Sequence, residues 1–375
     1  MGQRAVNTVR RLIYAETVRA IAFVSLGFLA LFFFFDFVEE LKAVNQIRAL
    51  GYQIPQALVF VALMIPGHLY ELLPITVLIG SVFVMARFAK SSEFTILRTS
   101  GLGPWLALKT LMIMGLGFVL FTFAVGDYVS PLADRSAQFL KSTFKGNLTH
   151  GKTGAWLKEK QASSHFAVNV GSMAADTSMR DVRIFEFDQN SRFVSLTTAP
   201  RAVAQADAAW VLYDAKRLVF TTTPGQPGAT AAQRSAEPSL RWPNKISADM
   251  VSAAILRPEN MATLDLFQYM RHLAENGQSA QKYELQFWKK VFYPLSCLVM
   301  VVLALPFAYL HFRSGGIAAY VFGGVMAGIS FMLLNNVLSD MATLQGWQPW
   351  LAAALPGLIY SLVSLSAFTW LVLRR

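Results

Sequence analysis

The sequence predicts a membrane protein with two groups of three spanning helices and a water-exposed β domain inserted between them. Three observations support this fold class. Hydrophobic residues make up 54% of the 375 residues and charged residues only 15%, whereas soluble domains are about 25% charged. The apolar residues concentrate in 20–130 and 285–373, with soluble composition between them. The single cysteine, Cys297, excludes a disulfide within the chain.

Apolar runs predict six spans, since a helix that crosses a bilayer needs roughly 20 such residues. Three runs precede the soluble stretch and three follow it: 20–38, 49–86, 110–126, 291–312, 314–339 and 341–373. The second run is ambiguous, because its length and its prolines also suit two short spans.

Basic residues resolve this ambiguity, because Lys and Arg collect on cytoplasmic loops. If 49–86 crosses once, the N-terminus, 87–109, Arg313 and the C-terminus share one side. Together they carry eleven basic and two acidic residues. We therefore expect one long second helix, cytoplasmic termini and an external domain, with boundaries at 1–130, 131–284 and 285–375. No small-x-small cleavage pattern follows the first apolar stretch, which predicts a retained helix rather than a signal peptide.

The central domain shows alternating segments typical of half-buried strands. They are 165–170, 182–187, 193–196, 210–213 and 217–221. Such short, regularly spaced strands predict a sandwich or jelly roll. The Ala-, Gln- and Ser-rich stretch 229–238 predicts a loop, and a helix is expected from Thr263 to Gly277. Lys289 and Lys290 are interpreted as interfacial anchors of the fourth span.

Several enzymatic and binding classes are disfavoured. Residues 146–153 match the phosphate-binding pattern G-x-x-x-x-G-K-T, but that motif needs a buried strand before it and a helix after it. Neither is expected here. The five histidines lack metal-ligand spacing. The net charge of +11 mostly lies on the cytoplasmic segments, so it sets orientation and does not indicate a nucleic-acid partner.

Acids at membrane depth are candidates for function by default. Asp36, Glu71 and Asp127 belong to this class. All three fall near expected span ends or a kink, so an interfacial, solvated role is favoured and a functional one stays open.

Two groups of residues are candidate sites. Basic side chains near the external mouth, which we call the rim residues, could bind an anionic lipid or a sugar phosphate: Lys42, Arg135, Lys141 and Lys145. A solvated surface is an equal alternative. The cytoplasmic segment 91–100 reads as a short capped helix that could dock to an ATPase or rest on lipid. Its candidate contacts are Ser92, Glu93, Phe94, Leu97 and Arg98.

Several segments resemble the LptF/LptG permeases of the lipopolysaccharide export transporter. They are FVEELK at 37–42, SEFTILRTSG at 92–101, GAWL at 154–157 and YELQFWKK at 283–290. The first of these and residues 328–331 favour the LptG branch.

The resemblance implies a non-catalytic permease subunit in the inner membrane of a Gram-negative bacterium, with a periplasmic β-jelly roll. Its implied partners are an LptF-like permease, an LptB-like ATPase dimer and an LptC-like bridge protein. Glu93 would contact the ATPase, which would bind ATP and Mg²⁺, and this chain would need no cofactor of its own. Helices one and five would form lateral gates.

The sequence departs from the family at two positions. Asp36 and Ala43 stand where LptG proteins can carry basic residues, so Lys42 and Lys141 are the stronger lipid candidates. The function expected is extraction of lipopolysaccharide from the inner membrane toward a periplasmic bridge. The alternatives are a membrane scaffold for a β domain and an intramembrane lipid-modifying enzyme.

Overall fold

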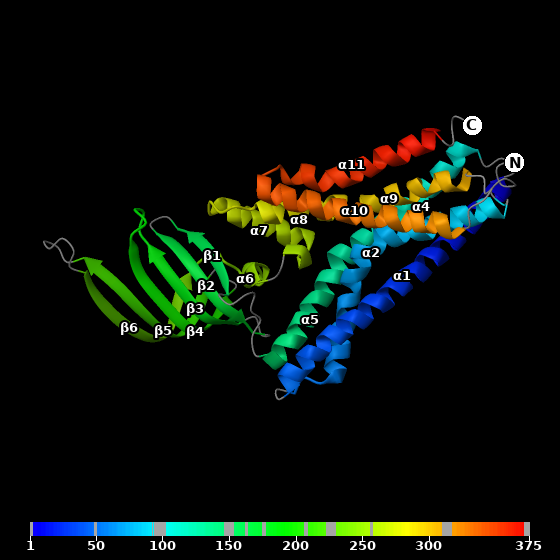
Figure 1. Ribbon diagram of the computed structural model, residues 1–375. Coiled ribbons are helices and arrows are strands. Elements are labelled where there is room, and N and C mark those ends of the chain that lie inside the picture. Colours follow the sequence, from blue (N-terminus) through cyan, green and yellow to red (C-terminus); the bar gives the residue numbers. More distant parts are fainter. Residues whose placement is uncertain are drawn as a thin grey trace. The chain divides into compact units, whose positions relative to one another are not determined.

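The computed structural model describes most of the chain (Figure 1). The described residues are 3–48, 51–91, 93, 103–145, 154–161, 164–174, 178–205, 209–222, 230–255, 258–309 and 317–370. They form two compact units. The helical unit comprises Met1–Leu41, Val61–Asp134 and Glu284–Arg375, and the second unit comprises Lys42–Phe60 and Arg135–Tyr283.

Long helices build the first half of the chain. Helix α1 runs over Gln3–Ile47 and α2 over Ile54–Lys90. Helix α2 is continuous through Pro66 and Pro74, which agrees with a single long second helix. Helix α4 (Pro104–Ala124) passes through the π-helical turn η2 (Val125–Val129) into α5 (Ser130–Lys145).

The C-terminal block is also helical. Helix α8 (Gln281–Phe292) is followed by α9 (Leu295–Ala304) and the 3₁₀ turn η4 (Leu305–Tyr309), then by α10 (Ile317–Gln345) and α11 (Pro349–Phe368). Five described helices are long and apolar enough to cross a membrane, or six if α8 and α9–η4, bent by 44°, form one span. The break follows from Pro294, which lacks the N–H that a continuous helix needs.

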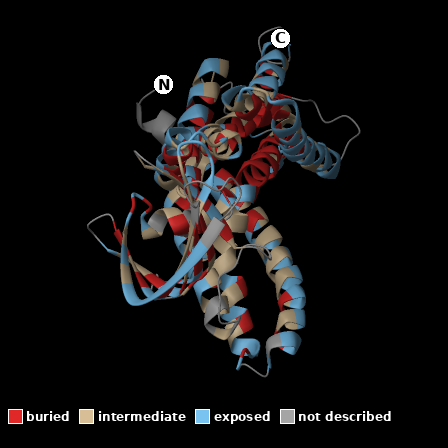
Figure 2. Ribbon diagram, turned by 90° about the vertical axis from the view of Figure 1, so that its left-hand side faces the viewer, coloured by how far each residue is buried: buried red, intermediate tan, exposed pale blue. Residues whose placement is uncertain are grey.

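Helix α2 lies at the centre of the helical unit. Its most apolar window is 83% buried, and Val77 and Val82 pack with Met300 of α9 in one core cluster. Figure 2 shows the buried residues, in red, concentrated on the inner helices of the helical unit. In Figure 1, the beginning of α1 and the end of α11 lie at the same end of this unit.

The second unit contains one six-stranded antiparallel sheet whose strands follow each other in sequence order. The strands are β1 (Ala155–Lys160), β2 (His165–Met173), β3 (Met179–Phe187), β4 (Phe193–Gln205), β5 (Ala209–Thr222) and β6 (Thr230–Pro243). The inserted β domain is therefore confirmed. Its described strands form a single curved sheet in up-and-down order (Figure 1).

A short helix and buried aromatic residues complete this unit. Trp210 on β5 is fully buried, and its indole Nε1 donates to the carbonyl of Ile246 at 2.7 Å. This bond fixes the segment before α6 (Ala248–Ile255), and Val251 of α6 joins the core of the sheet. The 3₁₀ turn η3 (Pro258–Asn260) and α7 (Thr263–Glu275) follow.

Two local expectations are wrong in this unit. The stretch 229–238 was expected to be a loop, but residues from Thr230 onward form β6, paired along its length with β5. The separate strands expected at 210–213 and 217–221 are one strand, β5, with Asp214 at a positive φ of 52° between them.

Candidate functional site

The rim residues that the sequence singled out all belong to the second unit, which includes the end of α1 and the start of α2. Lys42 is exposed near the end of α1. The ammonium group of Lys141 on α5 lies 4.3 Å from the ring centroid of Phe60 on α2. Phe144, one turn further along α5, meets the buried ring of Tyr52 at a centroid distance of 5.4 Å. Helix α5 is thereby fixed against the connection between α1 and α2.

Arg135 has a second role that the sequence did not reveal. Its guanidinium forms an ion pair with the carboxylate of Asp265 on α7, and both side chains are partly exposed. Part of the positive charge is therefore neutralised within the unit. Lys145 is the last residue of α5, and its side chain lies outside the described residues.

Of the proposed cytoplasmic segment 91–100, the structure describes only Ser91 and Glu93. Ser92, Phe94, Leu97 and Arg98 lie outside the described residues. Glu93 is helical and exposed. Just before it, the Ser91 hydroxyl donates to the carbonyl of Arg87 at 3.0 Å and so extends the end of α2. The exposed carboxylate of Glu93 is thus available to a partner.

Asp36, one of the three acids at membrane depth, pairs with a histidine. Its Oδ2 lies 2.6 Å from Nε2 of His68 on α2, and both side chains are mostly buried. The pair joins α1 to α2. The backbone carbonyl of Glu71, one turn further along α2, accepts a hydrogen bond from the Tyr293 hydroxyl at 2.5 Å, while Asp127 is half-buried in η2.

Lys290 has a structural role that its place in the sequence does not reveal. It was interpreted as an interfacial anchor, but it is only 7% exposed. Its Nζ donates to the carbonyl of Gly126 in η2 at 2.8 Å. The Tyr70 ring packs directly against Gly126. No larger residue would fit there, since an added Cβ would lie 2.3 Å from the ring. Gly126, a glycine within a predicted span, is the one sequence feature that could have pointed to this contact. The π turn itself has no sequence signature.

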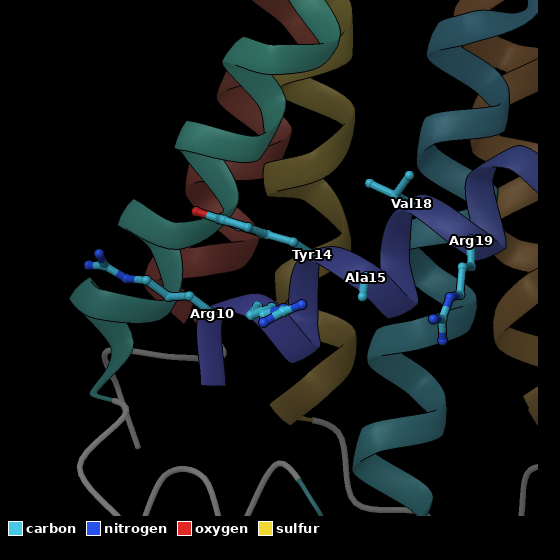
Figure 3. A pocket seen from close by; sticks show the side chains of 6 residues that line it. Arg10, Tyr14, Ala15, Val18 and Arg19 are labelled. Atoms are coloured by element: carbon cyan, nitrogen blue, oxygen red, sulfur yellow. The ribbon is translucent and has the colours of Figure 1, made fainter. Parts of the chain in front are cut away.

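Two hollows lie along the N-terminal half of α1. An apolar groove of about 580 Å³ is bounded by α1, α2 and α4, with Leu73 and Phe118 among its lining residues. A basic hollow of about 620 Å³ lies on α1 itself (Figure 3). It is lined by Arg10, Arg11, Tyr14, Ala15, Val18 and Arg19.

These features define a class: a multi-pass membrane protein with a β domain inserted between two helical blocks. Residues 11–374 match the family described as lipopolysaccharide export system permease LptF/LptG, and the chain belongs to this family. It is 27% identical to the lipopolysaccharide export system permease protein LptG of Haemophilus influenzae over 99% of both chains. It is 26% identical to the LptG protein of Escherichia coli K12 over 90% of both.

Family membership establishes the general activity. The chain is an LptG-like permease component of a lipopolysaccharide export system, part of an ABC transport system and not itself catalytic. The scaffold and lipid-modifying alternatives are excluded on this ground.

Proposed function

We propose that this chain is the LptG-type half of a permease that extracts lipopolysaccharide from the inner membrane and passes it to a periplasmic bridge. An LptF-type permease would supply the other half, and an LptC-type protein would join the bridge. An LptB-type ATPase dimer would bind ATP and Mg²⁺ on the cytoplasmic side.

The unequal burial of the helices carries this proposal. Only 11% of the most apolar window of α1 and 17% of that of α10 are buried, against 83% for α2. Helices α1 and α10, the first and fifth spans, therefore have few fully buried residues in the single chain, and many of their apolar side chains are exposed or only partly covered. Such surfaces suit a cavity shared with a second permease, in which lipid acyl chains and helices can exchange contacts.

The topology proposed from the charges has local support. Nη2 of Arg87, near the end of α2, donates to Oε2 of Glu16 on α1 at 2.5 Å. The end of α2 therefore lies beside the start of α1, as a single crossing by α2 requires. We place both ends of the chain in the cytoplasm and the domain spanning 131–284 in the periplasm.

The ATPase contact would be formed by the segment containing Ser92, Glu93, Phe94, Leu97 and Arg98. Replacing Glu93 with alanine should weaken attachment of the ATPase and lower lipopolysaccharide-stimulated ATP hydrolysis, because a charge-assisted contact contributes about 1.5–3 kcal/mol. Co-purification and hydrolysis rates measure both effects. The exposed Glu275→Ala on α7 is the control. Unchanged assembly together with unchanged stimulation would refute this contact.

The rim residues would bind the phosphorylated sugars of lipopolysaccharide. Lys42→Glu combined with Lys141→Glu should reduce photocrosslinking to lipopolysaccharide by about tenfold, since two attractive contacts become repulsive. The control pair Lys109→Glu and Lys282→Glu changes the charge equally at exposed positions elsewhere. If both pairs give equal crosslinking, the rim residues are only a solvated surface. Arg135 and Lys145 would contribute less, Arg135 because Asp265 already neutralises part of its charge.

A further inference from the structure

The basic hollow and the apolar groove on α1 share two lining residues, Tyr14 and Val18. The hollow beside three arginines at the N-terminal end of α1 is therefore adjacent to an apolar groove deeper in the bundle. In Figure 3, Arg10 and Tyr14 extend from α1 toward α4. The Tyr14 hydroxyl donates to the carbonyl of Thr110 on α4 at 3.2 Å, which joins the two helices where the hollows meet.

The positive charge of this surface is only partly neutralised. Glu16 accepts hydrogen bonds from Arg19 at 3.4 Å and from Arg87 at 2.5 Å. Among the described residues, Arg10 and Arg11 have no ion-pair partner, and the buried Nε of Arg10 has no hydrogen-bond acceptor. The guanidinium groups of Arg10 and Arg11 therefore carry positive charge that no described carboxylate neutralises, and an anionic ligand can neutralise it.

The groove offers space for a lipid acyl chain rather than for a compact molecule. Its walls are apolar side chains from three helices, including Ile21, Leu69 and Phe121. Gly117 lies in the wall formed by α4, and a Cβ built on it would have no neighbour within 4 Å. The glycine therefore keeps the groove open.

We propose that this surface binds one anionic diacyl phospholipid of the leaflet next to the N-terminus, with its phosphate on Arg10 and Arg11 and an acyl chain in the groove. Guanidinium groups match phosphate oxygens in geometry and charge, and clusters of basic residues near a membrane surface attract anionic head groups. The charge favours a lipid over a partner's apolar helix. This site is separate from the rim residues and does not depend on the transport proposal.

The test uses the full chain in its purified complex and compares phosphatidylglycerol with phosphatidylethanolamine of the same acyl chains, by native mass spectrometry. Phosphatidylglycerol should bind preferentially. Arg10→Gln with Arg11→Gln should weaken its binding by about tenfold or more. The matched pair Lys90→Gln and Lys109→Gln removes the same charge at exposed positions and should leave binding unchanged. Arg10→Lys with Arg11→Lys should retain part of it.

A second variant tests the groove without touching the arginines. Gly117→Leu should fill the groove and weaken phosphatidylglycerol binding, whereas Gly357→Leu on α11, also at a glycine with open space around it, should not. Equal binding of the two phospholipids, or full binding by the arginine-to-glutamine variant, would overturn the proposal. Displacement of phosphatidylglycerol by inorganic phosphate or by lipid A at the same concentration would also overturn the proposal. A crosslink showing that a partner's helix fills the groove would do the same.

Discussion

Lys290 shows how one residue can satisfy a backbone carbonyl at a π-helical turn within a long helix. The π turn η2 disrupts the regular hydrogen-bond pattern where α4 becomes α5, and the buried ammonium group donates to the carbonyl of Gly126. In a membrane, an unpaired backbone carbonyl is expensive because water cannot replace the partner. The lysine therefore stabilises the turn and need not act on a substrate.

Lys290→Met should lower the stability of the purified protein by about 1.5–3 kcal/mol, the contribution of a hydrogen bond to a charged group. Thermal unfolding in detergent measures it. Lys282→Met changes an exposed residue of the same helix and should have almost no effect. Equal losses for both variants would show that the bond to Gly126 is not a stabilising contact.

Residue-level predictions from sequence succeed where the residue type alone determines the outcome. The exposure of Lys42 follows from its charge. The ion pair of Arg135 with Asp265 joins residues 130 positions apart, and the burial of Lys290 depends on a turn in another helix. Neither can be read from local sequence, because the partner is set by how the helices pack.

At the scale of elements, glycines determine where helices approach closely. A Cβ on Gly80 of α2 would lie 2.6 Å from Cγ1 and 2.8 Å from the backbone of Ile21 on α1. On α10, a Cβ on Gly328 would lie 3.0 Å from Ile75. Gly324 and Gly328 of α10 thus let this helix pack closely on α2.

Gly80→Ala should force α1 away from α2 and destabilise the protein by about 1–3 kcal/mol, as overpacking does. Gly27→Ala on α1, where a Cβ meets open space, should be neutral or slightly stabilising. Thermal unfolding of the two variants in parallel measures this difference in stability. A neutral Gly80→Ala would mean that α1 is held loosely against α2.

Elements were predictable where the sequence shows a long apolar run, as in α2, or an alternation of apolar and polar residues, as in β2 and β3. The long α2 and strands β2, β3 and β4 follow their apolar patterns. Strand β6 was missed because Ala, Ser and Gln have low strand propensity, and its exposed residues form no apolar stripe. It forms because β5 offers hydrogen-bonding groups along the entire register from Ala209 to Thr222.

At the scale of the whole molecule, composition and charge predicted two blocks of helices separated in the sequence by a β domain, since both reflect the lipid environment. The exposed faces of α1 and α10 show that the chain is built to contact lipid or other subunits. Such faces fit the proposed role of this chain as one half of a lipopolysaccharide permease that works with partner subunits.

The most direct measurement is ATP-driven release of lipopolysaccharide from proteoliposomes to a soluble acceptor, with and without this chain beside the second permease and the ATPase. Release should require both this chain and ATP, and Glu93→Ala should reduce it. Release that proceeds at the same rate when this chain is omitted would contradict the account.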